Sequence, residues 1–175
     1  MSEIFSHTAL GQPWHNDQWL SSLVMASLYS LGGLDLLHVF KGLLLGLSWL
    51  VLVDCGYRLA PQKGQGWVFG LFWAILTIQF CHIAYFFDVR AYLFTYLFLA
   101  AFWRWLILEQ RRPLWIWAMV VLLWANLHAG VIIGLFLLGF VNLLRWSGRF
   151  GAGFDSCPSW RGLLLLVLVS MLNPS

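Results

Sequence analysis

The sequence predicts an all-α protein whose chain crosses a membrane several times. Of its 175 residues, 61% are hydrophobic and only 10% are charged, whereas roughly 25% of the residues of a soluble domain are charged. On a soluble globule, the 12 tryptophans and 14 phenylalanines would form large apolar patches facing water. Lipid is therefore the expected solvent. The net charge of +3 is spread along the chain, which argues against a nucleic-acid-binding module.

The chain is expected to begin outside the membrane. Residues 1–17 predict a polar outer tail, because they lack the basic start and apolar stretch of a signal peptide. Residues 18–31 predict a helix that is too short to span a bilayer and that Gly32 and Gly33 end. We expect this helix to lie in the membrane interface.

The remaining apolar segments are measured against the bilayer. A hydrocarbon core of about 30 Å requires roughly 20 apolar helical residues. The predicted transmembrane helices are residues 34–53, 66–87 and 91–108. Residues 114–144 are too many for one upright crossing and too few for two, and the polar stretch 126–130 interrupts them. Residues 162–172 begin a further helix that stops before it spans, so that residues 1–175 form a single membrane domain.

Basic residues near the ends of spans mark the cytoplasmic side. With the N-terminal tail outside and residues 114–144 folded as a re-entrant hairpin, eight Lys and Arg residues fall inside and two, Lys41 and Arg90, fall outside. A single crossing of 114–144 divides the ten equally. The charges therefore predict a broken helix pair with residues 126–130 at its tip. Non-helical backbone at membrane depth has to be covered by protein or line a wet cavity, and we expect this tip to line a cavity.

In this topology the polar residues of the membrane region gather at the outer side. They are Asp35, His38, Lys41, Gln79, His82, Asp88, Arg90, Asn126 and His128, with Asp17 in the outer tail. Ionisable groups in a membrane usually mark a functional site. Carboxylates, cations and imidazoles together suit the binding of a lipid-linked phosphate and the removal of a proton from an acceptor hydroxyl.

Each of these residues also has a structural alternative. The charged residues of the first span form an ion-pair stripe in one reading, and Asp88 caps the following helix. In the corresponding alternatives for the other residues, Arg90 contacts lipid phosphates, and the Asn126 and His128 side chains make interhelical hydrogen bonds. A haem protein with His82 and His128 as axial ligands is a further alternative. The three cysteines lie far apart without a C-x-x-C spacing, so neither a disulfide framework nor a structural zinc site is predicted.

Several short runs occur in an order that resembles bacterial multi-pass membrane proteins of the GT-C glycosyltransferase superfamily. They are Pro13–Ser21 (PWHNDQWLS), Leu31–Gly33, Asp88–Arg90 followed by Leu93–Thr95, Leu123–Gly130 (LWANLHAG) and Leu172–Pro174. The W-A-N-L-H-x-G run is the most specific of them. The match extends over nearly the whole chain.

The resemblance implies a protein of the bacterial inner membrane that transfers a sugar from a polyprenyl-phosphate donor to an acceptor at the periplasmic face. It implies an acidic residue of the first outer loop as the catalytic base or as the partner of a divalent cation. Asp17 is the candidate, because Gln18 stands where the family usually has Glu. The candidate substrate-binding residues are Lys41, Asp88, Arg90, Asn126 and His128.

Such a family has helices before and after the stretch that these runs cover, so we expect a central piece of such an enzyme or a reduced relative. The alternative function is a membrane scaffold or carrier that binds a lipid-linked saccharide without transferring it. The expected partners are membrane lipids, the lipid-linked donor and other packing helices, and not nucleic acid.

Overall fold

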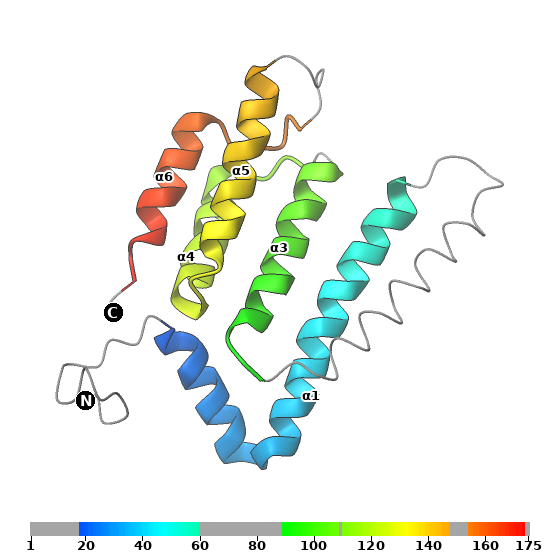
Figure 1. Ribbon diagram of the computed structural model, residues 1–175, viewed down its shortest axis with the longest axis vertical. Helices are drawn as coiled ribbons and strands as arrows, with labels where there is room; N and C mark the ends of the chain where they lie inside the picture. The colour runs from blue at the N-terminus through cyan, green and yellow to red at the C-terminus, as the bar shows by residue number, and fades with distance from the viewer. Residues whose placement is uncertain (1–17, 60–88, 109, 148–153, 174–175) are drawn as a thin grey trace, which may run out of the picture.

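The computed structural model describes residues 18–59, 89–108, 110–147 and 154–173. All the regular structure in these ranges is α-helical, as the sequence predicts. The helices are α1 (Trp19–Leu59), α3 (Tyr92–Ile107), α4 (Leu114–Leu127), α5 (Val131–Trp146) and α6 (Trp160–Ser170), drawn in Figure 1. The span predicted over residues 66–87 and the polar tail 1–17 lie outside the described residues.

Helix α1 consists of two limbs that meet at Gly32 and Gly33, and Figure 1 shows the sharp bend between them. Gly33 has φ 62° and ψ −152°, a conformation that is essentially restricted to glycine. The first limb is the predicted short helix, and its predicted boundary at the two glycines is confirmed. The second limb was expected to end at Val53 but continues to Leu59.

Two ion pairs accompany the extension past Val53. Both are made by Asp54, the first residue after the predicted end of the span. Arg58, one turn further along α1, donates a hydrogen bond to Asp54 at 2.8 Å, and Arg104 of α3 donates another at 2.9 Å. Both guanidinium groups thus compensate the carboxylate within this last part of α1.

The segment predicted as a broken helix pair folds as two helices. Helix α4 ends at Leu127, three residues turn, and α5 begins at Val131 and runs back beside α4 (Figure 1). The predicted interruption is thereby confirmed, with the turn at His128–Gly130. The last predicted helix begins at Trp160, two residues earlier than expected, and ends at Ser170.

The turn between α4 and α5 defines one end of the molecule, which we call the hairpin-tip end. Val89–Ala91, which lead into α3, lie at the same end (Figure 1). The last turns of α1, α3 and α5 and the first turns of α4 and α6 lie at the other end, which we call the opposite end.

Two apolar clusters hold the helices together. In the larger one, the ring of Phe102 lies 4.8 Å from that of Trp117 and 5.4 Å from that of Trp124, and all three side chains are almost completely buried. Aromatic pairs of this kind contribute about 0.5–1.5 kcal/mol beyond their buried area. The smaller cluster joins α1 to the start of α3 and the end of α4 through Leu44, Leu45, Leu93, Phe94 and Leu127.

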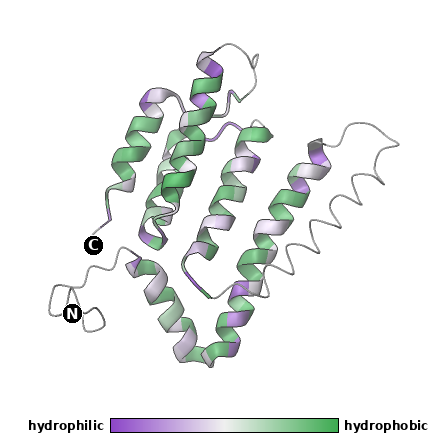
Figure 2. Cartoon of the chain, viewed as in Figure 1, coloured by the Kyte–Doolittle hydropathy of each residue, from purple (hydrophilic) through white to green (hydrophobic). Residues whose placement is uncertain are grey.

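Hydrophobic residues make up most of each described helix (Figure 2), and many of the large ones are exposed. Leu31, Phe136, Trp146 and Met171 are each at least 70% exposed. Among the described residues, one helix, Trp19–Arg58, is long and apolar enough to cross a membrane, and only 17% of its most apolar stretch is buried. Helix α3, predicted as a full span over 91–108, has 16 residues, which rise about 24 Å.

Candidate functional site at the hairpin tip

Close backbone approach shapes the turn between α4 and α5. His128 leaves the helical conformation with φ −162° and ψ 139°, and its backbone N–H still donates to the Trp124 carbonyl at 2.8 Å. A methyl group at Gly130 would overlap the hydroxyl of Thr95 and the ring of His128. Glycine is therefore required at position 130, where the turn packs directly on α3.

A chain of hydrogen bonds determines which nitrogen of His128 carries the proton. The backbone N–H of Gly130 donates to Nδ1 of His128 at 2.9 Å, so Nδ1 is an acceptor. The Thr95 hydroxyl accepts from Nε1 of Trp124 at 3.0 Å and lies 2.9 Å from the same Nδ1, to which it donates. The imidazole is therefore the neutral tautomer with its hydrogen on Nε2. Nε2–H is the donor that this half-buried ring offers to a ligand.

Asn126 is engaged at both ends of its amide group. Its Oδ1 accepts from Nε1 of Trp19 at 2.8 Å, and its Nδ2 donates to the Leu122 carbonyl at 2.8 Å. A longer contact of 3.4 Å joins Nδ2 to the carbonyl of Leu172. Asn126 thus attaches the start of α1 and the segment after α6 to the end of α4. These contacts favour the structural alternative of an interhelical hydrogen bond for Asn126.

The two cations predicted at the outer side lie on elements that meet at the hairpin tip. Lys41 is half-buried on the second limb of α1, and Arg90 is exposed two residues before α3 begins. The neighbouring residue Phe40 packs on Phe94 of α3, with ring centroids 5.9 Å apart. Lys41 and Arg90 therefore lie at the same end as the ring of His128.

The structure does not place the remaining predicted site residues in the hydrogen-bond chain of the hairpin tip. His38 is exposed, and its Nδ1–H donates to the Leu34 carbonyl of its own helix at 2.7 Å, while Asp35 is also exposed. Asp17, Asp88 and His82 lie outside the described residues, so the predicted base and the haem pair rest on the sequence alone. Within the described ranges, no three His, Cys, Asp or Glu side chains converge on a metal site.

The site also contains three residues that the sequence analysis did not name as site candidates, although Thr95 ends one of the runs that carry the family resemblance. Thr95, Trp124 and Trp19 supply three of its hydrogen-bonding groups. Trp124 and Trp19 lie in the two tryptophan-containing runs that carry the family resemblance, which is the signal that could have identified them. Nothing in the sequence pairs Thr95 with a histidine 33 residues away.

An apolar groove approaches the hairpin tip from the side. It has a volume of about 650 Å³ and lies between α1, α3 and α5. Tyr96 and Ile133 line it within one turn of Thr95 and Gly130, and Leu52, Trp103 and Phe140 line it further along the helices. The groove is thus a long apolar surface that ends within one helical turn of Thr95 and Gly130, and neither of these two residues lines it.

Comparisons with protein-family models, with curated proteins and with solved structures find no match to this chain.

Proposed function

We propose that the chain is a multi-pass membrane protein that binds a polyprenyl-phosphate sugar at the hairpin-tip end and transfers the sugar to an acceptor there. The single observation that carries the proposal is an apolar groove that ends within one helical turn of the segment holding His128, whose Nε2–H is left as a donor. An amphiphilic ligand with a long apolar chain and an anionic head matches such a surface. The family resemblance supplies the reaction.

The exterior of the protein supports its placement in a membrane. The long helix α1 and the exposed apolar side chains favour lipid contact over water contact. Six of the eight basic residues in the described ranges lie on the terminal turns or loops of the opposite end. Because cytoplasmic ends are the basic ones, the hairpin tip then faces the outer side.

The short helices fit a re-entrant hairpin. Helix α4 has 14 residues, which rise about 21 Å and fall short of a core of about 30 Å. A hairpin entering from the opposite end therefore turns in the outer part of the bilayer, in a cavity that we propose is open to water from the outer face, where Ala129 is exposed. The first limb of α1 covers the turn through the bond from Trp19 to Asn126, as exposed backbone at that depth requires.

The proposed chemistry distributes roles among the named residues. Lys41 and Arg90 bind the donor phosphate electrostatically, and Nε2–H of His128 donates to one of its oxygens. The acceptor hydroxyl attacks the anomeric carbon of the sugar, and the bond from that carbon to the phosphate oxygen breaks. The hydroxyl proton passes to Asp17, and polyprenyl phosphate leaves with the bonding electron pair. Within the described ranges, no three His, Cys, Asp or Glu side chains are placed to hold a metal ion.

Binding and transfer are tested separately in lipid nanodiscs. Arg90→Gln should weaken binding of a polyprenyl phosphate about tenfold, because one charge-assisted hydrogen bond contributes about 1.5–3 kcal/mol. Arg161→Gln, the same charge change at the opposite end, is the matched control and should leave affinity unchanged. Equal affinity of both variants for the donor contradicts the site.

Transfer is measured as release of polyprenyl phosphate from the sugar-loaded donor in the presence of acceptor. Asp17→Asn should bind the donor normally and abolish release. If the wild-type protein binds the donor and never releases polyprenyl phosphate with any acceptor, the protein is a carrier and the enzymatic proposal is wrong.

A further inference from the structure

A second polar pocket lies at the opposite end, away from the proposed donor site. It has a volume of about 270 Å³ and opens between the loop before α4 and the segment before α6. The residues that line it include Arg111, Arg112, Trp117, Asp155, Ser159 and Gly162. This volume is slightly below the roughly 300 Å³ at which pockets for whole small molecules begin, so a headgroup-sized ligand fits it better than a sugar nucleotide.

The indole nitrogen of Trp117 is the observation that points to a ligand. Trp117 is 1% exposed and lines the pocket, and its Nε1–H has no hydrogen-bond partner among the described residues. Among the described residues, it is the one buried side-chain donor that lacks a hydrogen-bond partner. Buried donors in folded proteins are nearly always paired. A hydrogen-bond acceptor inside the pocket would satisfy it.

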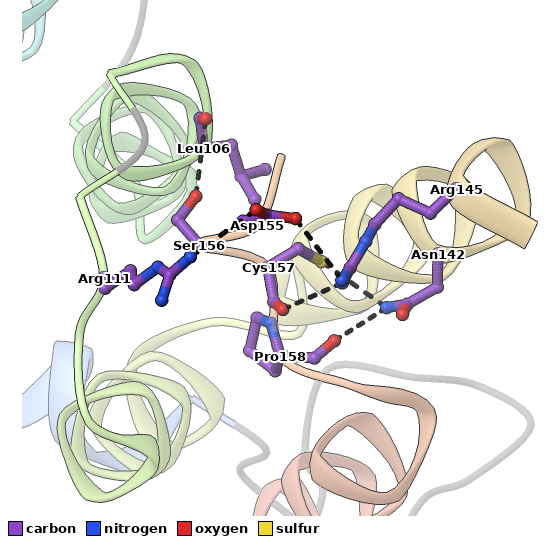
Figure 3. A network of polar contacts seen from close by, with 8 residues as sticks. All are labelled: Leu106, Arg111, Asn142, Arg145, Asp155, Ser156, Cys157 and Pro158. Carbon is purple, nitrogen blue, oxygen red and sulfur yellow. Dashed lines mark hydrogen bonds and ion pairs between the residues drawn. The ribbon is translucent and has the colours of Figure 1, made fainter. Parts of the chain in front are cut away.

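The charges around the pocket favour an anion. Arg111 lies 3.5 Å from Asp155, and Arg145 approaches the same carboxylate only to 3.9 Å (Figure 3). These are loose contacts, and the side chain of Arg111 is 79% exposed. Most of its N–H groups therefore point to solvent or to a ligand. Arg112, held 5.9 Å above the ring of Trp105, brings a second guanidinium to the lining.

The first turn of α6 adds further donors. Ser159 caps this helix by accepting from the Gly162 N–H at 3.4 Å. The other amides of the first turn lack intrahelical acceptors, and the positive end of the helix dipole faces the pocket. Indole, guanidinium and amide N–H groups are all donors. A ligand with several acceptor oxygens and a negative charge complements all of them.

We propose that this pocket binds the phosphate group of an anionic phospholipid headgroup. The exposed Trp115 and Trp160 at the same end fit a position at the membrane interface, where tryptophan is enriched. The site is independent of sugar transfer at the hairpin tip. Inorganic phosphate offers the same negatively charged acceptor oxygens as the lipid headgroup. The experiment below therefore compares a phospholipid with inorganic phosphate.

The test is a calorimetric titration of the purified protein in a non-ionic detergent. The probes are a short-chain phosphatidylglycerol, a short-chain phosphatidylcholine and inorganic phosphate. Phosphatidylglycerol should bind on the order of tenfold more tightly than the zwitterionic phosphatidylcholine. The double variant Arg111→Gln/Arg112→Gln should lose at least about tenfold in affinity for phosphatidylglycerol, as expected for lost charge-assisted hydrogen bonds. Competition by inorganic phosphate assigns recognition to the phosphate alone, and its absence assigns recognition to the lipid diester; both support the site.

Matched variants separate the pocket from general charge and aromatic content. Trp117→Phe keeps a ring and removes the N–H, and should weaken binding several-fold; Trp115→Phe, two residues away and exposed, should not. Arg161→Gln should change affinity less than about twofold. If Trp117→Phe fails to fold, the exposed arginine pair alone carries the test. Unchanged affinity in the folded Trp117→Phe variant or in the double arginine variant overturns the proposal.

Discussion

Replacing Thr95 by valine tests the hydrogen-bond chain at the hairpin tip. Valine preserves the shape of this buried side chain but removes the hydroxyl that accepts from Trp124 and contacts His128. The indole N–H of Trp124, which is fully buried, then loses its partner. An orphaned buried donor costs about 1–3 kcal/mol, so Thr95→Val should lower the free energy of unfolding by this amount.

Thermal unfolding in detergent, followed by circular dichroism, measures the effect. For a chain of this length each kcal/mol lowers Tm by about 2–4 °C, so a cost of about 1–3 kcal/mol should lower the Tm of Thr95→Val by roughly 2–12 °C. Ser48→Ala is the control, because Ser48 is equally buried but donates only to the Leu44 carbonyl of its own helix at 2.7 Å. It should cost less than about 1 kcal/mol.

A double-mutant cycle makes the reasoning sharper. Trp124→Phe removes the donor that Thr95→Val would orphan, so the double variant should be about 1 kcal/mol or more less destabilised than the sum of the single variants. Strictly additive effects, or a Thr95→Val variant as stable as Ser48→Ala, would refute the chain from Trp124 through Thr95 to His128.

Three further outcomes follow from the structure. Gly33→Ala should destabilise the protein by about 1–3 kcal/mol because of its backbone conformation, whereas Gly42→Ala, in open space within the helix, should stabilise it by up to about 1 kcal/mol; equal Tm shifts would contradict the bend. Burial raises the pKa of the Cys157 thiol to about 11, so at pH 8 the reactive thiolate is roughly a hundredfold scarcer than for an ordinary thiol. With the other two cysteines changed to serine, iodoacetamide should label Cys157 at pH 8 only after denaturation, and rapid labelling of the native protein would disprove the buried position. The purified protein should be colourless, since we assign His128 to phosphate binding; a Soret band lost in His128→Ala would establish the haem alternative.

The sequence predicted the interruptions of the helices better than their contacts. Gly32 and Gly33, and the polar run ending in Gly130, mark breaks because glycine and polar residues disfavour continuous apolar helix. Both breaks are where they were expected. The end of the second α1 limb lies beyond the predicted Val53, at Leu59. The pairing of Asp54 with Arg104 in this extension joins residues 50 positions apart, which the sequence does not reveal.

Contacts between residues far apart in the chain also limit what the sequence reveals about the site. The W-A-N-L-H run identified Asn126 and His128 as residues of interest, but it could not assign their roles. Asn126 faces Trp19, 107 residues earlier, and His128 faces Thr95. Which polar groups satisfy each other depends on how helices rotate against one another, and that rotation is set by packing such as the contact of Gly134 with the ring of Trp124.

The central claim is that the protein lies in a membrane with its hairpin tip facing outward and its opposite end facing the cytoplasm. Single cysteines at Ala129 and Ser159, both exposed positions at the two ends, test it directly in cells that express a variant lacking the native cysteines. A membrane-impermeant maleimide should label Ala129→Cys in intact cells and Ser159→Cys only after permeabilisation. Labelling of Ser159→Cys in intact cells, with Ala129→Cys protected, would contradict the account.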